Sequence, residues 1–449
     1  CCCRGDGDGD GIQTIALLVD IKVNRMTPNF YFGTLLQDLL LRGSCYQDGT
    51  QLVNAGRCMD KAAENGHLAL LKWAQTNSSQ NNCTAGAMNS AAANGHLSVV
   101  EWLQAHRSEG CSTYAMNQAG ANGHLPVVKF LHAHRLEGCT PWAINKAAEN
   151  GHLAVVEWLH ANRSEGCTTD AMNRAAGNGH LTVVQWLHAH RNEGCTSWAM
   201  DKAAENGHLA VVEWLHANRS EGCTTDAMNR AAGNGHLTVV QWLHANRSEG
   251  CSFVAMDLAA GSGHLAVVEW LYGSRLERCS RRAMNKAAMR GHLSVVEWLH
   301  AHRLRSFNTD AMDLAAKNGH LAVVKWLHNN CSEGCTTQAM DGASQHGHLA
   351  VVEWLHNNRS EGCTSMAMTE AAKHGHLAVV KWLYANRLEG CNTSAVGMAA
   401  ENGHLSVAEW LLANGLEDSQ VSDLSDQDQA STKSHLATVE WLKYHMYVD

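Results

Sequence analysis

The sequence has few prolines, no long apolar run and no excess of basic charge, and each shortage argues against a class of protein. Only 3 of its 449 residues are proline, so long helical segments are left uninterrupted. The formal net charge is −9, whereas nucleic-acid-binding domains usually carry a basic surface. The apolar run at residues 15–19 is closed by Asp20 and is far shorter than the roughly 20 residues that cross a bilayer. We therefore expect no nucleic-acid partner and no membrane span.

The sequence also lacks the short motifs that accompany common catalytic and cofactor sites. It contains no G-x-S-x-G nucleophile turn, no P-loop and no glycine pattern of a dinucleotide-binding fold. No secretory signal peptide is visible at the N-terminus. These absences predict a protein that is not an enzyme, with no catalytic residues and no bound cofactor.

The sequence is dominated by a repeated tripeptide, Gly-His-Leu. Its histidine recurs thirteen times, first after 29 residues and then every 28, at 67, 96, 124, 152, 180, 208, 236, 264, 292, 320, 348, 376 and 404. A fixed period of this length is typical of repeat arrays, in which each unit buries its apolar face only against its neighbours. An array of this kind grows along one axis, so 449 residues do not require several globular cores.

One unit, residues 170–196, predicts two helices. Met172, Ala175 and Ala176 lie at i, i+3 and i+4, on one helical face, and Asp170 precedes them as a helix cap. Residues 178–179 supply a turn, and a second helix is expected over about 180–190. Its apolar residues, including Trp186, cover more than half its circumference, which predicts a helix buried between neighbours.

The sequence of residues 171–187, Ala-Met-Asn-Arg-Ala-Ala-Gly-Asn-Gly-His-Leu-Thr-Val-Val-Gln-Trp-Leu, closely resembles the helix pair of an ankyrin repeat. Residues 170–173 stand where that family has Thr-Pro-Leu-His. Ankyrin repeats run 33 residues and these run 28, so the segment that forms a β-hairpin finger in the family is replaced by a short loop. The resemblance implies an all-α fold, an ankyrin-like α-solenoid of stacked helix-turn-helix repeats without long β-hairpin fingers.

The pattern divides the chain into four parts. Residues 1–11 are expected to be a disordered leader and residues 12–56 a degenerate N-terminal cap. About thirteen ankyrin-like repeats occupy residues 57–413. Residues 414–449 hold an acidic segment followed by a degenerate C-terminal cap repeat.

Histidine and cysteine are abundant, with 29 and 17 copies, and raise the alternative of a metal-binding protein or a zinc- or iron-dependent enzyme. Most of the copies recur once per repeat, and packed helices lie roughly 8–10 Å apart, too far for equivalent residues to share an ion or form a disulfide. Cys331 and Cys335 are the closest pair after the leader and lack further ligands nearby. We predict no metal site, reduced thiols and an intracellular, cytoplasmic location.

Two positions in each first helix vary from repeat to repeat, one before the first Ala and one before the Ala-Ala pair. We call the surface that they form the first-helix edge; it corresponds to the concave partner surface of the ankyrin family. Trp, Tyr and Arg dominate binding hot spots, and the edge residues that we predict to contact a partner are Tyr114, Trp142, Lys146, Arg174, Trp198, Lys202, Arg230 and Phe253.

A local interpretation competes with partner binding at these positions. Each tryptophan can pack over the lysine four residues on, and Asp170 and Asp226 can pair with Arg174 and Arg230. On balance the sequence favours a monomeric, non-enzymatic scaffold that binds other proteins. A purely structural spacer is the third alternative.

Overall fold

The structure is a computed structural model that describes residues 55–77, 83–274, 280–302, 308–391 and 394–416. The described residues form 26 helices and no strand, which confirms the all-α prediction for this part of the chain. The chain divides into two compact units, residues 1–203 with 210–222, and residues 204–209 with 223–449. The predicted leader, most of the N-terminal cap and nearly all of the acidic segment and C-terminal cap lie outside the described residues.

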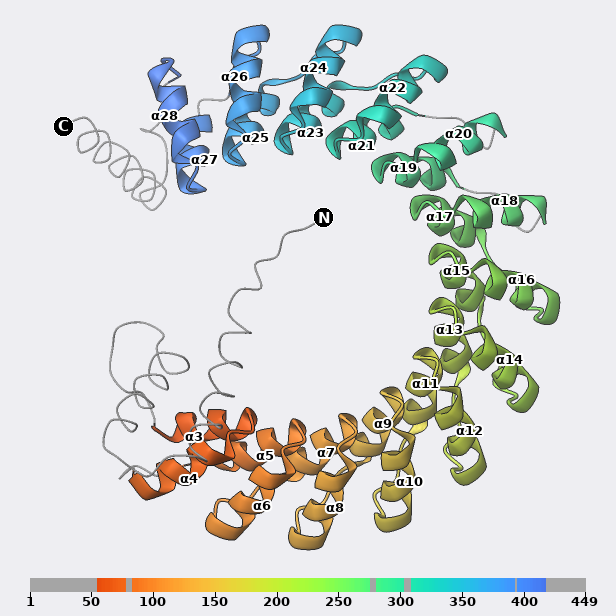
Figure 1. Cartoon of the computed structure of the whole chain (residues 1–449). Helices are drawn as coiled ribbons and strands as arrows, with labels where there is room; N and C mark the ends of the chain where they lie inside the picture. The colour runs from red at the N-terminus through yellow and green to blue at the C-terminus, as the bar shows by residue number, and fades with distance from the viewer. Residues whose placement is uncertain (1–54, 78–82, 275–279, 303–307, 392–393, 417–449) are drawn as a thin grey trace. The chain divides into compact units, whose positions relative to one another are not determined.

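The helices alternate between a first helix and a second helix of each repeat (Figure 1). The first unit holds α3 (Ala55–Glu64), α4 (Leu68–Asn77), α5 (Ala85–Ala93), α6 (Leu97–His106), α7 (Thr113–Ala121), α8 (Leu125–His134), α9 (Pro141–Glu149), α10 (Leu153–Asn162), α11 (Thr169–Gly177), α12 (Leu181–His190), most of α13 (Ser197–Glu205) and α14 (Leu209–Asn218).

The second unit continues the same alternation. It holds α15 (Thr225–Gly233), α16 (Leu237–Asn246), α17 (Phe253–Gly261), α18 (Leu265–Gly273), α19 (Arg281–Met289), α20 (Leu293–Ala301), α21 (Asp310–Lys317), α22 (Leu321–Asn330), α23 (Thr337–Gln345), α24 (Leu349–Asn358), α25 (Ser365–Lys373), α26 (Leu377–Asn386), α27 (Ala395–Glu401) and α28 (Leu405–Ala413).

The core of each unit is built from first helices that pack directly on one another. In the first unit α5, α7, α9 and α11 lie side by side, and each carries its second helix on one side (Figure 1). The Ala-Ala pair, Ala175 and Ala176 in α11, is completely buried, because only small side chains allow helices to approach so closely. On the second helix Val183 and Leu187 are also buried, so each repeat contributes one apolar face to its neighbours.

The turn between the two helices requires glycine for two reasons. Gly179 has φ 80°, a left-handed conformation that other residues adopt with strain. At the equivalent Gly151, a Cβ atom would lie 2.6 Å from Nδ1 of His180 in the next repeat. The Gly-His pair of the repeat is therefore a contact between neighbours: the glycine leaves room for the following histidine ring.

Two local predictions need correction. The cap of α11 is Thr168, whose hydroxyl accepts a hydrogen bond from the backbone N–H of Asp170 at 3.2 Å; Asp170 itself lies inside the first turn. The repeated tryptophan, expected to be buried, is half-exposed at Trp186. The ring of His160 from the preceding repeat packs edge-on against Trp186, with centroids 5.2 Å apart, so the tryptophan lies at the margin of the core.

Candidate functional site

The first-helix edge presents exposed aromatic side chains in both units. Tyr114 of α7 is 51% exposed, Trp142 of α9 37% and Trp198 of α13 38%. In the second unit Phe253 of α17 is 47% exposed. Large apolar side chains with this exposure lie outside the core, so they are available to a partner without unfolding a repeat.

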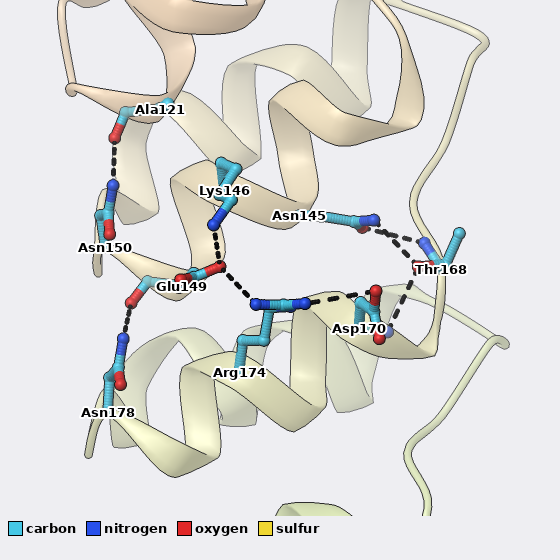
Figure 2. A network of polar contacts seen from close by, with 9 residues as sticks. All are labelled: Ala121, Asn145, Lys146, Glu149, Asn150, Thr168, Asp170, Arg174 and Asn178. Carbon is cyan, nitrogen blue, oxygen red and sulfur yellow. Dashed lines mark hydrogen bonds and ion pairs between the residues drawn. The ribbon is translucent and has the colours of Figure 1, made fainter. Parts of the chain in front are cut away.

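Charged residues link neighbouring repeats along the same edge of the first unit (Figure 2). Lys146 Nζ lies 2.8 Å from a carboxylate oxygen of Glu149, and the guanidinium of Arg174 lies 3.4 Å from the same carboxylate. Arg174 also reaches Asp170 in its own helix at 3.9 Å. The edge is therefore a connected ionic network that joins α9 to α11 (Figure 2).

The two edge tryptophans carry cations over their rings. Lys146 Nζ lies 5.9 Å from the ring centroid of Trp142, and Lys202 Nζ lies 5.8 Å from that of Trp198. Arg174 Cζ, from the preceding repeat, lies 6.0 Å from the Trp198 ring. Such contacts stabilise exposed sites by about 0.5–1 kcal/mol and fix the orientation of the ring. The local pairs predicted from sequence are therefore present, and partner contact by the same residues stays a prediction.

In the second unit the predicted residues are more loosely arranged. Arg230 lies 3.3 Å from Asp226 and 3.7 Å from Glu205, the same pairs as at Arg174, but no aromatic ring of the described second unit lies over its guanidinium. Phe253 lies in the next first helix, α17. The eight predicted residues are thus distributed over six first helices. The structure brings Lys146 onto Trp142, and Arg174 and Lys202 onto Trp198.

A hydrogen-bonded ladder that was not predicted lies beside this edge. The residue two positions after the first Ala of each of these first helices accepts from the backbone N–H of the next repeat's helix cap. Asn145 Oδ1 accepts from Thr168 N at 3.0 Å (Figure 2), and Asn173 Oδ1 accepts from Thr196 N at 2.9 Å. Its Nδ2 donates to the same threonine's hydroxyl, at 2.9 Å for Asn145. The signal was present, because this slot is Asn or Asp in eleven consecutive repeats, from Asp60 to Asp341.

A second feature that was not predicted is an Arg–Glu ion pair in eight of the described loops that follow a second helix. Arg163 donates to Glu165 two residues on, and both lie beside the buried Cys139 of the preceding loop. Burial raises the pKa of the Cys139 thiol to about 11, and the nearby Glu165 adds to the shift while Arg163 opposes it. A thiol protonated at neutral pH is a weak nucleophile, so the arrangement does not favour cysteine catalysis.

Among the described residues no group of three or more His, Cys, Asp or Glu side chains is placed to hold a metal ion. Cys331 Sγ lies 3.9 Å from Nδ1 of His300, which is a pair without further ligands. The histidine of Gly-His-Leu is half-buried at the turn, as His124 illustrates. Burial lowers the pKa of His124, and a backbone hydrogen bond at Ala93 partly opposes this shift. None of the described helices is long and apolar enough to cross a bilayer.

Comparison with known families matches the chain to ankyrin repeats. A model of ankyrin repeats (many copies) matches residues 59–104, 144–188, 200–244 and 368–412, and a model of ankyrin repeats (3 copies) matches residues 256–341. These matches fall in both units of the array. No protein with a curated description matches the chain significantly.

Solved structures similar to this chain include two of a pentatricopeptide repeat protein. The crystal structure of PPR10 from maize is 12% identical, with 98% of this chain and 73% of that chain covered and a TM-score of 0.33. A cysteine-to-serine variant of PPR10 in complex with an 18-nt PSAJ RNA element is also 12% identical, with 95% and 78% covered and a TM-score of 0.29.

The prediction of no nucleic-acid partner is not retained. The expectation rested on the net charge of −9. Net charge averages over the whole surface, whereas a phosphate contacts only the basic groups near it. An acidic total therefore excludes nothing about a local basic surface.

Proposed function

Because the chain belongs to the ankyrin repeat family, we propose that it is a non-enzymatic scaffold that binds partner proteins along its first-helix edge. The observation that carries this proposal is the pair Trp142 and Trp198, each more than one third exposed and each held by a cation from its own helix. The partner-contacting residues of the proposal are Tyr114, Trp142, Lys146, Arg174, Trp198, Lys202, Arg230 and Phe253.

The physical basis of binding is a rigid surface with a few large anchors. A protein interface gains most of its affinity from a minority of residues, and these are enriched in Trp, Tyr and Arg. Lys146 and Arg174 already fix the two tryptophan rings, so little side-chain entropy is lost when a partner packs on them. The flanking charges of the network then favour one orientation of the partner over another.

The test is the double variant Trp142→Ala/Trp198→Ala, compared with the intact chain by cross-linking in cells and quantitative identification of captured proteins. Hot-spot losses of about 2 kcal/mol or more predict at least a tenfold drop in capture of the specific partners, at unchanged helical circular dichroism. Tyr272→Ala is the matched control, since Tyr272 is 39% exposed but belongs to second helix α18. Unchanged capture by the tryptophan variant would remove the edge from consideration.

The metal alternative has its own test. Stoichiometric zinc or iron in the purified chain, measured by elemental analysis, would replace the scaffold proposal with a metal-dependent function. A structural spacer would instead capture no protein specifically in the cross-linking experiment.

An intracellular, cytoplasmic location is part of this proposal. Eleven of the described cysteines are free thiols, among them the buried Cys195 and Cys363. Free thiols persist in reducing compartments, which supports a location inside the cell.

A further inference from the structure

One repeat of the second unit carries an unusual concentration of positive charge. Its first helix, α19, places Arg282 and Lys286 at i and i+4 on the first-helix edge, with Arg281 beside them. Arg290, the C-cap residue of α19, follows four residues after Lys286, and its guanidinium donates to the backbone carbonyl of Gly261 in α17 at 3.0 Å. Arg281, Arg282 and Arg290 are exposed and Lys286 is half-buried. No carboxylate of the described residues forms an ion pair with any of these four cations, which we call the α19 basic stripe.

Apolar side chains border the α19 basic stripe on both sides. On the preceding first helix, α17, Phe253 and Val254 are 47% and 36% exposed and Leu258 is half-buried. On the following helix, α21, Leu314 is half-buried at the position equivalent to Lys286. A Cβ atom on Gly261 would lie 2.9 Å from Cβ of Lys286, so α17 and α19 approach closely and the cations lie directly beside the apolar rim.

The extent of the stripe favours a short acidic segment over a nucleic-acid backbone. Nucleic acids are bound by rows of cations that follow the phosphates over several turns. Here the edge of α17 carries no charge, and α21 contributes Asp310 as well as Lys317. A surface about one repeat wide, roughly 8–10 Å, with aliphatic borders suits an extended peptide that carries both carboxylates and aliphatic side chains.

The sequence of this chain contains such a segment. Residues 416–429 read Leu-Glu-Asp-Ser-Gln-Val-Ser-Asp-Leu-Ser-Asp-Gln-Asp-Gln, with five carboxylates and the aliphatic Val421 and Leu424, and no basic residue. An extended peptide at 3.3 Å per residue would place Asp423 and Asp428 about 16 Å apart. The stripe from Arg282 to Arg290 extends over about 12 Å at 1.5 Å per residue, so the two charge rows match in length.

The acidic segment as a whole cannot lie along the stripe of its own chain, because the part up to Asp423 does not reach it. The described residues end at Leu416, beside α28, and α27 lies four first helices beyond α19. Four steps of 8–10 Å separate them by about 32–40 Å. The seven residues from Leu416 to Asp423 span at most about 25 Å.

We propose that the acidic segment 417–428 of one copy of this chain docks on the α19 basic stripe of a second copy. The carboxylates then face Arg281, Arg282, Lys286 and Arg290, and the aliphatic side chains of Val421 and Leu424 pack against Phe253 and Val254. Because each copy has one segment and one stripe, the contact is heterologous and links copies head to tail. This inference goes beyond the proposed function, since its occupant is the chain itself.

The first experiment measures binding of a fluorescently labelled synthetic peptide, residues 416–430, to the purified full chain by anisotropy. We expect saturable binding that weakens as salt rises from about 50 to about 300 mM, because the contact is largely ionic and exposed. The same peptide with its five acidic residues replaced by Asn or Gln is expected to bind at least tenfold more weakly. Equal binding of the neutral peptide would overturn the proposal.

Charge reversal locates the site. The double variant Arg281→Glu/Arg282→Glu is expected to weaken binding of the acidic peptide at least tenfold. The charge-matched control is Lys325→Glu/Lys381→Glu, on exposed positions of second helices α22 and α26, and it is expected to leave binding unchanged. Circular dichroism confirms that both variants are folded. A peptide whose acidic residues are replaced by lysine is expected to bind the charge-reversed stripe variant, which would support docking on the stripe. An equal loss of acidic-peptide binding in the stripe variant and the control variant would overturn the proposal.

The second experiment measures self-association of the intact chain by sedimentation velocity over a concentration series. We expect concentration-dependent association that is lost on deletion of residues 417–428 and in Arg281→Glu/Arg282→Glu. A monomer at all concentrations, or an 18-nucleotide RNA that binds the stripe while the acidic peptide does not, would overturn the proposal. Both experiments contain only this chain and a defined probe, so their failure leaves partner capture by Trp142 and Trp198 untouched.

Discussion

Removal of the Asn173 side chain tests whether the hydrogen-bonded ladder couples neighbouring repeats. Asn173 is 4% exposed; its Oδ1 accepts from Thr196 N at 2.9 Å, and its Nδ2 donates to Thr196 Oγ1 at 3.2 Å. The same hydroxyl caps α13 by accepting from Trp198 N at 3.3 Å. One side chain therefore joins α11 to the start of the next first helix.

The magnitude follows from these contacts. Asn173→Ala removes two hydrogen bonds, each worth about 1 kcal/mol, and leaves a backbone N–H without its acceptor, which costs about 1–3 kcal/mol. We expect a loss of about 2–4 kcal/mol. Asn173→Asp is the matched control, because Asp341 occupies the same slot and accepts from Thr364 N and Thr364 Oγ1, both at 2.8 Å. It should cost less than about 1 kcal/mol at pH 7.

Hydrogen exchange is the primary measurement, because repeat arrays open locally and a single unfolding free energy averages over many units. At about 1.4 kcal/mol per tenfold, Asn173→Ala should accelerate exchange of the Thr196 amide by at least tenfold, and amides of α5 should be unaffected. Urea unfolding followed by circular dichroism provides the second readout. Unchanged protection of Thr196 in the alanine variant would show that apolar packing alone couples the repeats.

Three further predictions test the core and the turns. Leu187→Ala should lower the free energy of unfolding in urea by about 2–5 kcal/mol, because Leu187 is 1% exposed. Leu136→Ala, at a fully exposed loop tip, should have no measurable effect. Similar losses of stability in both variants would refute the assignment of the core. Ser344→Ala should raise stability by about 1 kcal/mol, because the buried Ser344 hydroxyl has no hydrogen-bond partner among the described residues; a destabilised alanine variant would reveal a partner for the hydroxyl. Burial lowers the pKa of His152 and His348 below the usual value of about 6.5, so the unfolded chain binds more protons than the folded chain at mildly acidic pH. The free energy of unfolding should therefore fall as pH decreases from about 6.5 through the folded-state pKa values. A free energy of unfolding that is constant between about pH 7 and 5 would contradict this.

Much of the fold could be predicted from the sequence because the repeat itself encodes it. The helix pair, the left-handed Gly179 and the buried Val183 and Leu187 all follow from a spacing of small and apolar residues. The predicted cap of α11 was wrong because Thr and Asp both serve as caps, and Thr168 is held in the cap position by the hydrogen bond that its backbone N–H donates to Oδ1 of Asn145 in the preceding repeat. Local sequence does not contain that neighbour.

The candidate site was predictable only within single helices. Asp170 and Arg174 are four residues apart, and their pairing follows from helical geometry. The contacts of Arg174 with Glu149 and with the Trp198 ring depend on how one first helix is rotated against the next, which residue spacing alone does not define. The α19 basic stripe was not predicted, because Arg281, Arg282 and Lys286 stand in slots that vary along the array, and Arg290 replaces the Asn that fills its slot in most other repeats.

Contacts between repeats separated by 28 residues join partners at fixed separations: 23 residues for Asn145 and Thr168, 29 for Asn150 and Ala121, and 31 for Arg191 and His160. A copied block that contains whole 28-residue units reproduces every one of these contacts without any compensating substitution, as the near-identity of residues 139–194 and 195–250 illustrates. The single step of 29 residues, from His67 to His96, keeps two of these contacts with one more residue between the partners: Asp60 with Thr84, and Glu64 with Asn94. The length of this protein can therefore change readily in whole units, and one added residue between two repeats leaves their contacts in place.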